Sequence, residues 1–132
     1  MKAIADLITQ KKRDGSTVFV CGNGGSAATA EHFTNDLFSR GVRAVCLNSN
    51  TAIMTMIAND YGYEYVFSKQ LEVYAEEGDL LVLISVSGKS PNIEMAKKIN
   101  IETVQLFGEP GENYAQAEDR HLRIAHEISE MV

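Results

Sequence analysis

The sequence predicts an α/β fold, a three-layer sandwich in which helices cover both faces of a parallel sheet. Helix-like and strand-like segments alternate along the chain, which is typical of this class. The segments at 17–21 and 79–85 are apolar runs bounded by turn residues, the pattern of strands buried on both faces. Strands that alternate with helices are joined by right-handed crossovers, and such crossovers make the sheet parallel.

The first part of the chain is expected to form a helix, a strand, a second helix and a second strand. Ile4, Leu7 and Ile8 recur at helical spacing, and the turn residues Asp14 and Gly15 end that helix. The first strand is a short apolar run that leads into a glycine-rich turn. These four elements are placed at residues 3–13, 17–21, 27–39 and 43–47.

The second part continues the alternation after a turn at residues 59–62. The segment Asp-Leu-Leu-Val-Leu-Ile-Ser at 79–85 is the strongest strand pattern in the chain. Pro91 stands at the first-turn position that proline favours, so a helix is expected to begin there. The elements of this part are placed at residues 64–74, 79–85, 91 onward, 103–107 and 113–131.

Length and charge limit the classes of function. The 132 residues predict one domain over 1–132, and the net charge of −6 without a basic stripe excludes a nucleic-acid scaffold. No apolar run reaches the length of a membrane helix, and the N-terminus has no signal-like segment, so a cytoplasmic protein without a membrane partner is expected. Cys21 and Cys46 lack metal-ligand spacing and are interpreted as core residues.

Two loops are the candidates for ligand binding. In open parallel sheets, ligands bind at the carboxyl ends of the strands near the switch point. The first strand is followed by Gly22-Asn-Gly-Gly-Ser26 and the third by Ser85-Val-Ser-Gly-Lys-Ser90. Glycine-rich turns at helix N-termini expose backbone N–H groups to anions, and serine hydroxyls can donate to them. The pair of loops predicts a phosphate or another anion as ligand.

Two standard nucleotide motifs fail in these loops. The dinucleotide pattern would need an acidic residue at the end of the next strand, where Leu47 and Asn48 stand. The segment Gly88-Lys-Ser90 resembles the end of a Walker loop, but the required leading glycine is Leu83. A nicotinamide site and a nucleoside triphosphate site are therefore not expected.

Five segments together carry a resemblance to a known family: Gly22–Ser26, His32-Phe33, residues 57–62, residues 67–70 and residues 84–92. In this order they resemble the sugar isomerase (SIS) domain family, and within it the phosphoheptose isomerases. The resemblance runs from about residue 15 to 132 and implies a flavodoxin-like sheet. It also implies a zinc-assisted conversion of sedoheptulose 7-phosphate to D-glycero-D-manno-heptose 7-phosphate. The family forms homotetramers, with the active site between protomers.

The resemblance assigns roles to individual residues. Ser85, Ser87 and Ser90 are the phosphate-binding serines, and Ser26 is the serine of the first loop. The whole expected substrate and phosphate set is Asn23, Gly24, Gly25, Ser26, Arg40, Asp60, Ser85, Ser87 and Ser90.

The zinc ligands implied by the resemblance are His32, Asp36, Glu118 and His126. A spacing of four puts the first two on one helical face, whereas a spacing of eight separates the last two by about 12 Å along a helix axis. The last pair must therefore lean together to share an ion. His121 falls outside the ligand set and is interpreted as a packing residue.

The chain also departs from the family pattern. Asp36 replaces a glutamate, Glu118 replaces a glutamine, and Val86 stands where a hydroxyl residue is usual. Most of the long N-terminal helix and a late strand of the family are missing, so the homo-oligomer is expected to be a tetramer or a dimer.

The expected reaction is aldose–ketose isomerisation through an enediol. Asp36 or Glu118 is the base, His126 is the acid or proton shuttle, and zinc polarises the carbonyl group. The alternative is a non-catalytic SIS domain that binds a sugar phosphate or a protein partner, of the regulatory or replication-initiator-associating type. The histidines with acidic neighbours favour the enzyme, because a binding module does not need them.

Overall fold

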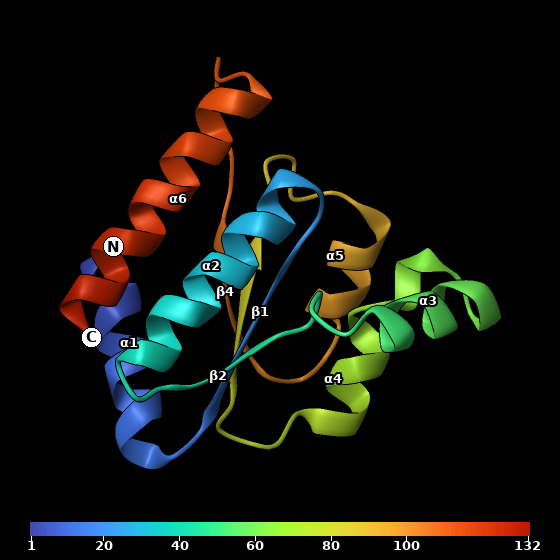
Figure 1. Cartoon of the computed structure of the whole chain (residues 1–132), viewed down its shortest axis with the longest axis horizontal. Coiled ribbons are helices and arrows are strands. Elements are labelled where there is room, and N and C mark those ends of the chain that lie inside the picture. The colour runs from blue at the N-terminus through green and yellow to red at the C-terminus, as the bar shows by residue number, and fades with distance from the viewer.

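A parallel sheet of four strands forms the centre of the computed structural model, which describes residues 1–132 (Figure 1). The strands are β1 (Thr17–Gly22), β2 (Arg43–Cys46), β3 (Leu80–Ile84) and β4 (Glu102–Leu106), in the order β2-β1-β3-β4. Because β2 and β3 lie on opposite sides of β1, the switch point of the sheet falls between β1 and β3. The expected α/β fold with a parallel sheet is confirmed.

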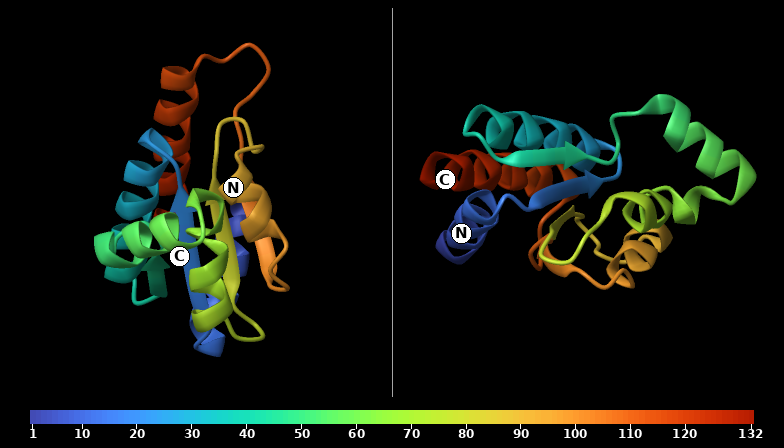
Figure 2. Two further views of the ribbon diagram at one scale, coloured as in Figure 1. Left: turned by 90° about the vertical axis from the view of Figure 1, so that its right-hand side faces the viewer. Right: turned by 90° about the horizontal axis from the view of Figure 1, so that it is seen from below.

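Helices cover both faces of this sheet, as Figures 1 and 2 show. One face carries α1 (Lys2–Asp14), α2 (Gly25–Ser39) and α6 (Tyr114–Met131). The other carries α3 (Thr51–Asp60), the short 3-10 helix Tyr63–Tyr65, α4 (Ser68–Tyr74) and α5 (Pro91–Lys97). None of these helices combines the length and the apolar character that crossing a membrane requires.

The core is divided into two apolar clusters by the sheet. Val18 and Val20 of β1 face the cluster under α2 and α6, whereas Phe19 and Cys21 face the cluster under α4 and α5. This division follows from the alternation of side chains along a strand. On the α2 side, Phe33 is fully buried. The first of these clusters holds α2 and α6 side by side, which matters for the site below (Figure 1).

The segment between β2 and β3 differs from the expectation. Helix α3 was not predicted; its N-cap is Asn50, whose side chain accepts a hydrogen bond from the N–H of Ile53 (3.0 Å). The single helix expected at 64–74 is wrong, because a 3-10 turn and α4 take its place. Val66 and Phe67, between these two pieces, are fully buried, so core packing interrupts the helix there.

Both cysteines are free thiols. Cys21 is fully buried and Cys46 is half-buried, and burial raises the pKa of both thiols. Thiols held in the protonated form are poor nucleophiles and poor metal ligands. Their environment is that of structural cysteines.

Candidate active site

The glycine loop starts where β1 meets β3 at the carboxyl edge of the sheet. A Cβ atom at Gly22 would lie 2.6 Å from the carbonyl oxygen of Ile84, so only glycine fits there. Asn48 holds Gly22 from the β2 side, accepting from its N–H (3.2 Å) and donating to its carbonyl oxygen (2.8 Å). Asn48 occupies the position where a dinucleotide site would hold a ribose, and here it clamps the loop instead.

The serine loop follows β3 and is held by its own backbone. The Ser85 hydroxyl accepts from the N–H of Gly88 (2.9 Å), and the Ser87 hydroxyl accepts from the N–H of Lys89 (3.2 Å). Since each hydroxyl acts as an acceptor in these bonds, its own proton is left to donate to a ligand oxygen. Ser90 ends the loop just before α5. The loop therefore has hydroxyl protons that could be donated to an anion.

A cavity of about 260 Å³ lies between the two loops. Its walls are formed by Asn23, Gly24, Gly25, Ser26, Ser85, Val86, Ser87, Ser90, Tyr114 and Glu118. A methyl group at Gly25 would collide with the Glu118 carboxylate, so Glu118 of α6 reaches across to the start of α2. Seven of the nine residues expected to bind substrate line this cavity. A larger hollow of about 630 Å³ lies along β2 and contains none of them.

A pair of asparagines ties the glycine loop to the start of α5, and this pair was not predicted from the sequence. The Asn23 and Asn92 side chains exchange two hydrogen bonds of 2.8 Å each, and the Tyr63 hydroxyl donates to the Asn23 side-chain oxygen (3.1 Å). Asn92 is only 2% exposed. The signal available in the sequence was an amide side chain in the first turn of a helix that starts at the sheet edge.

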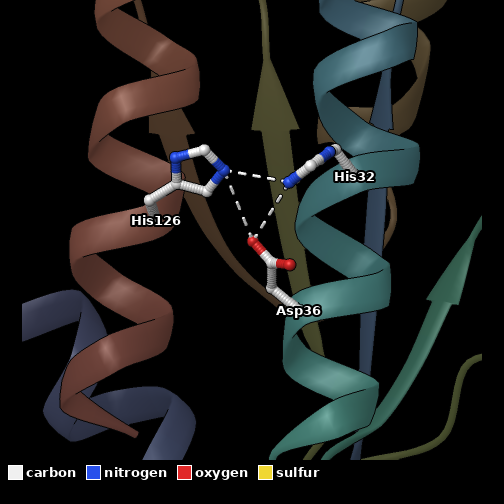
Figure 3. Close-up of side chains that lie close together, drawn as sticks. All are labelled: His32, Asp36 and His126. Carbon is white, nitrogen blue, oxygen red and sulfur yellow. Dashed lines mark hydrogen bonds and ion pairs between the residues drawn. The ribbon is translucent and has the colours of Figure 1, made fainter.

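His32, Asp36 and His126 form a second cluster, built from α2 and α6 (Figure 3). The two histidine Nε2 atoms lie 2.9 Å apart. One oxygen of Asp36 lies 3.6 Å from His32 Nε2 and 3.8 Å from His126 Nε2. The histidine side chains are about half exposed, whereas Asp36 is 21% exposed. Three potential ligand atoms therefore converge at the surface between the two helices.

The cluster fits a zinc ion in its number of ligands and their spacing. Two ligand atoms of a tetrahedral zinc site are about 3.3 Å apart, given Zn–N bonds of about 2.0 Å. The three separations in the cluster are 2.9, 3.6 and 3.8 Å, one below and two above this value. Three protein ligands with one open position are typical of catalytic zinc. Neutral histidines and one carboxylate would leave such an ion with one net positive charge.

Three of the expected site residues lie away from the groups to which they were assigned. Glu118 lines the serine cavity and is not part of the three-residue cluster. Arg40 caps the far end of α2, about 21 Å along the axis from Ser26. Asp60 is exposed at the end of α3 and accepts a bond from its neighbour Asn59 (2.9 Å). Neither Arg40 nor Asp60 lines the cavity.

His121 is a buried packing residue. It is 0% exposed, and its Nε2 lies 2.7 Å from the carbonyl oxygen of Phe107, so this nitrogen carries the proton and donates. The interpretation of His121 as a packing residue outside the ligand cluster agrees with this environment.

Comparison with known sequences identifies the same family over most of the chain. Residues 1–108 match the model of the SIS domain. The phosphoheptose isomerase 1 of Campylobacter jejuni is 32% identical, over 98% of this chain and 83% of the relative. The phosphoheptose isomerase of Clostridium acetobutylicum is also 32% identical, over 100% of this chain and 80% of the relative.

Solved structures agree with the sequences. The phosphoheptose isomerase GmhA of Neisseria gonorrhoeae superposes with a TM-score of 0.91 at 32% identity, covering 96% of this chain and 81% of the other. This chain therefore belongs to the SIS-domain family and, within it, to the phosphoheptose isomerase group of isomerases.

Proposed function

We propose that this isomerase interconverts the aldose and ketose forms of a sugar phosphate, with sedoheptulose 7-phosphate and D-glycero-D-manno-heptose 7-phosphate as its pair of substrates. The observation that carries the proposal is that the serine cavity and the His32–Asp36–His126 cluster share the helices α2 and α6. One site offers donors for a phosphate, and the other offers groups for proton transfer. The similar sequences are those of phosphoheptose isomerases, which supports the choice of substrate.

The separation of the two sites favours a long sugar. Ser26 and His32 are about 9 Å apart along α2, and Glu118 and His126 about 12 Å apart along α6. An extended carbon chain advances about 1.25 Å per bond, so C1 and the phosphorus of a heptose 7-phosphate are about 10 Å apart. In a pentose 5-phosphate the same atoms are about 7.5 Å apart. The heptose phosphate therefore matches the spacing better than the pentose phosphate does.

The phosphate end would be bound by Ser85, Ser87 and Ser90. Hydrogen bonds to a charged group are stronger than those between neutral groups, so these hydroxyls supply binding energy remote from the reacting carbons. That energy orients the carbonyl end toward α2 and α6. Glu118, inside the cavity, would accept hydrogen bonds from sugar hydroxyls along the chain.

The carbonyl end would react at the cluster. Asp36 is the proposed base, taking the proton from the carbon beside the carbonyl group, and His126 is the proposed acid that protonates the carbonyl oxygen. Zinc bound by His32, Asp36 and His126 would act as a Lewis acid toward that oxygen. His126 Nε2 can be a ligand or a proton donor but not both at once, so these two roles are alternatives.

A coupled isomerase assay tests the proposal directly. Purified protein is supplied with heptose 7-, hexose 6- and pentose 5-phosphates, and product is measured over time. We expect kcat/KM to be at least about tenfold higher for the heptose, the discrimination that a single carbon can provide. Binding without turnover of any of the three would instead identify the non-catalytic binding module.

The double substitution Ser87→Ala/Ser90→Ala is expected to weaken sugar-phosphate binding by about 1 to 3 kcal/mol, because two hydroxyl donors to a charged group are lost. Isothermal titration calorimetry measures the dissociation constant. Ser49→Ala, at an exposed serine outside the cavity, is the matched control and should leave it unchanged. Unchanged affinity in the double variant would remove the serine loop from the site.

We also propose that the protein acts in the cytoplasm as a homo-oligomer, a dimer or a tetramer. Arg40 and Asp60 do not line the cavity of their own chain, so they could complete a substrate site only from a neighbouring copy or after a rearrangement. Light scattering during size-exclusion chromatography measures the molar mass of the active species. We expect a mass at least twice that of one chain, and a fully active monomer would contradict the proposal.

A further inference from the structure

We infer that Arg120 is a positioning residue for phosphate binding. From helix α6 it anchors the backbone of Phe107, and the Phe107 ring in turn holds Gly88 in the serine loop. The inference rests on the proposed function, because it concerns the loop assigned there to the phosphate.

The contact between Phe107 and Gly88 leaves no free space. Gly88 has a φ of +65°, and a Cβ atom built on it would collide with the ring of Phe107. The N–H of Gly88 is the group that holds the Ser85 hydroxyl (2.9 Å). Because the ring and this hydrogen bond act on the same residue, a displaced ring allows Gly88 to move and Ser85 to turn. The position of the ring therefore affects the orientation of the Ser85 hydroxyl in the cavity.

Two further contacts join the loops that follow β3 and β4. The N–H of Gly108 donates to the carbonyl oxygen of Val86 (3.0 Å). Lys97 donates to the carbonyl oxygen of Gly88 (2.8 Å), and its ammonium group lies 5.6 Å from the centre of the Phe107 ring. This is a cation–π distance. The loop after β4 thus packs against the serine loop.

The loop after β4 is held to α6 by hydrogen bonds. The carbonyl oxygen of Phe107 accepts from Arg120 (2.6 Å) and lies 2.7 Å from Nε2 of His121. The Phe107 side chain itself is not anchored by burial, since the residue is 41% exposed. The position of the ring therefore depends on the hydrogen bonds to its backbone.

Arg120 contributes more than one of these bonds. Its guanidinium group also binds both oxygens of Glu112 (2.7 and 3.0 Å), and Glu112 accepts from the N–H of Glu109 (2.8 Å). Arg120 thereby folds residues 109–112 against α6. Its hydrogen bonds lower the pKa of the Glu112 carboxyl to about 2, so the pair stays ionised at the pH of any activity assay. A lysine has no planar guanidinium group, so it cannot form the two bonds to Glu112 and the bond to Phe107 together.

The test compares Arg120→Gln with Arg123→Gln. Both changes remove one positive charge from α6, but Arg123 is 70% exposed and pairs only loosely with Glu127 (3.8 Å). We expect Arg120→Gln to raise both KM for the sugar phosphate and the inhibition constant of inorganic phosphate about five- to twentyfold, a loss comparable to that of a single hydrogen bond. We expect kcat to change less than twofold. Arg123→Gln should change none of these values.

Three additional measurements separate positioning from general damage. Gly88 packs against the Phe107 ring, so its nuclear magnetic resonances should shift in Arg120→Gln without any ligand and stay in place in Arg123→Gln. Phe107→Ala, which removes an exposed ring, should reproduce the weaker phosphate binding even if Arg120→Gln fails to fold. Arg120→Lys keeps the positive charge but loses the planar guanidinium group. It should therefore behave like Arg120→Gln.

The outcomes also separate this inference from the proposed function. If the unaltered protein neither binds nor converts sugar phosphates, the proposed function fails. If the unaltered protein is active, the inference is overturned by equal effects in the two arginine variants, by a loss of kcat at unchanged KM, or by unchanged phosphate binding in Phe107→Ala.

Discussion

Replacing His126 by alanine is expected to lower kcat at least about 100-fold, the lower range for loss of a general acid or base. The substitution removes one of the two imidazoles that lie 2.9 Å apart, and with it either a metal ligand or a proton donor. The His126 side chain is 46% exposed, so the protein should keep its fold and its melting temperature. Steady-state kinetics, metal analysis of the purified variant and thermal unfolding measure these effects.

His121→Ala, on the same helix, provides the contrast. It leaves a cavity where the buried imidazole was and removes one hydrogen-bond donor from the carbonyl oxygen of Phe107. The free energy of unfolding should therefore fall by about 2 kcal/mol or more. Its metal content should equal that of the unaltered protein. The assignment of His126 to the cluster would be wrong if His126→Ala kept full turnover and full metal content.

Chelation of the unaltered protein completes this experiment. Removal of the metal should abolish turnover and leave the dissociation constant of inorganic phosphate nearly unchanged, because the serine loop binds through hydroxyl groups. A chelated protein with full activity would exclude a metal role for His32, Asp36 and His126.

The positions of the glycine loop and the serine loop could be predicted from the sequence because they depend on local patterns and one rule of topology. Each loop follows a buried apolar strand, and neighbouring parallel strands end at the same edge of the sheet. Gly22 and Ser85 come together for this reason. The spacing of His32 and Asp36 was also predictable, since residues four apart share a helical face.

The pairing of α2 with α6 lies outside what such patterns can predict. His32 and His126 are separated by 94 positions, and only the packing of the two helices on one face of the sheet brings them together. The resemblance to a family supplied this pairing, and the composition of the helices did not. The Arg120 anchor was missed for the same reason, because its partner Phe107 is defined by tertiary contacts. Helix α3 was missed although its Asn50 cap is a local signal.

The case of Glu118 shows where the resemblance and the helix geometry disagree. The resemblance assigns Glu118 to the metal, whereas eight residues of helix put it about 12 Å from His126 along the axis. In the structure, Glu118 lies against Gly25 in the serine cavity. Its role as a base or a ligand stays a prediction, and the geometry favours Asp36 for the base.

Asp36→Asn and Glu118→Gln, two matched exchanges of a carboxylate for an amide, decide between these carboxylates. Asp36→Asn should lower kcat at least about 100-fold, because an amide of the same shape cannot accept the proton. Glu118→Gln should lower kcat less than tenfold and should tighten phosphate binding by on the order of 1 kcal/mol, since a negative charge leaves the cavity that holds the anion. Kinetics and calorimetry on both variants, at one pH and one salt concentration, provide the comparison. A larger loss of kcat in Glu118→Gln than in Asp36→Asn would reverse the assignment and place the reacting carbons beside the serine cavity.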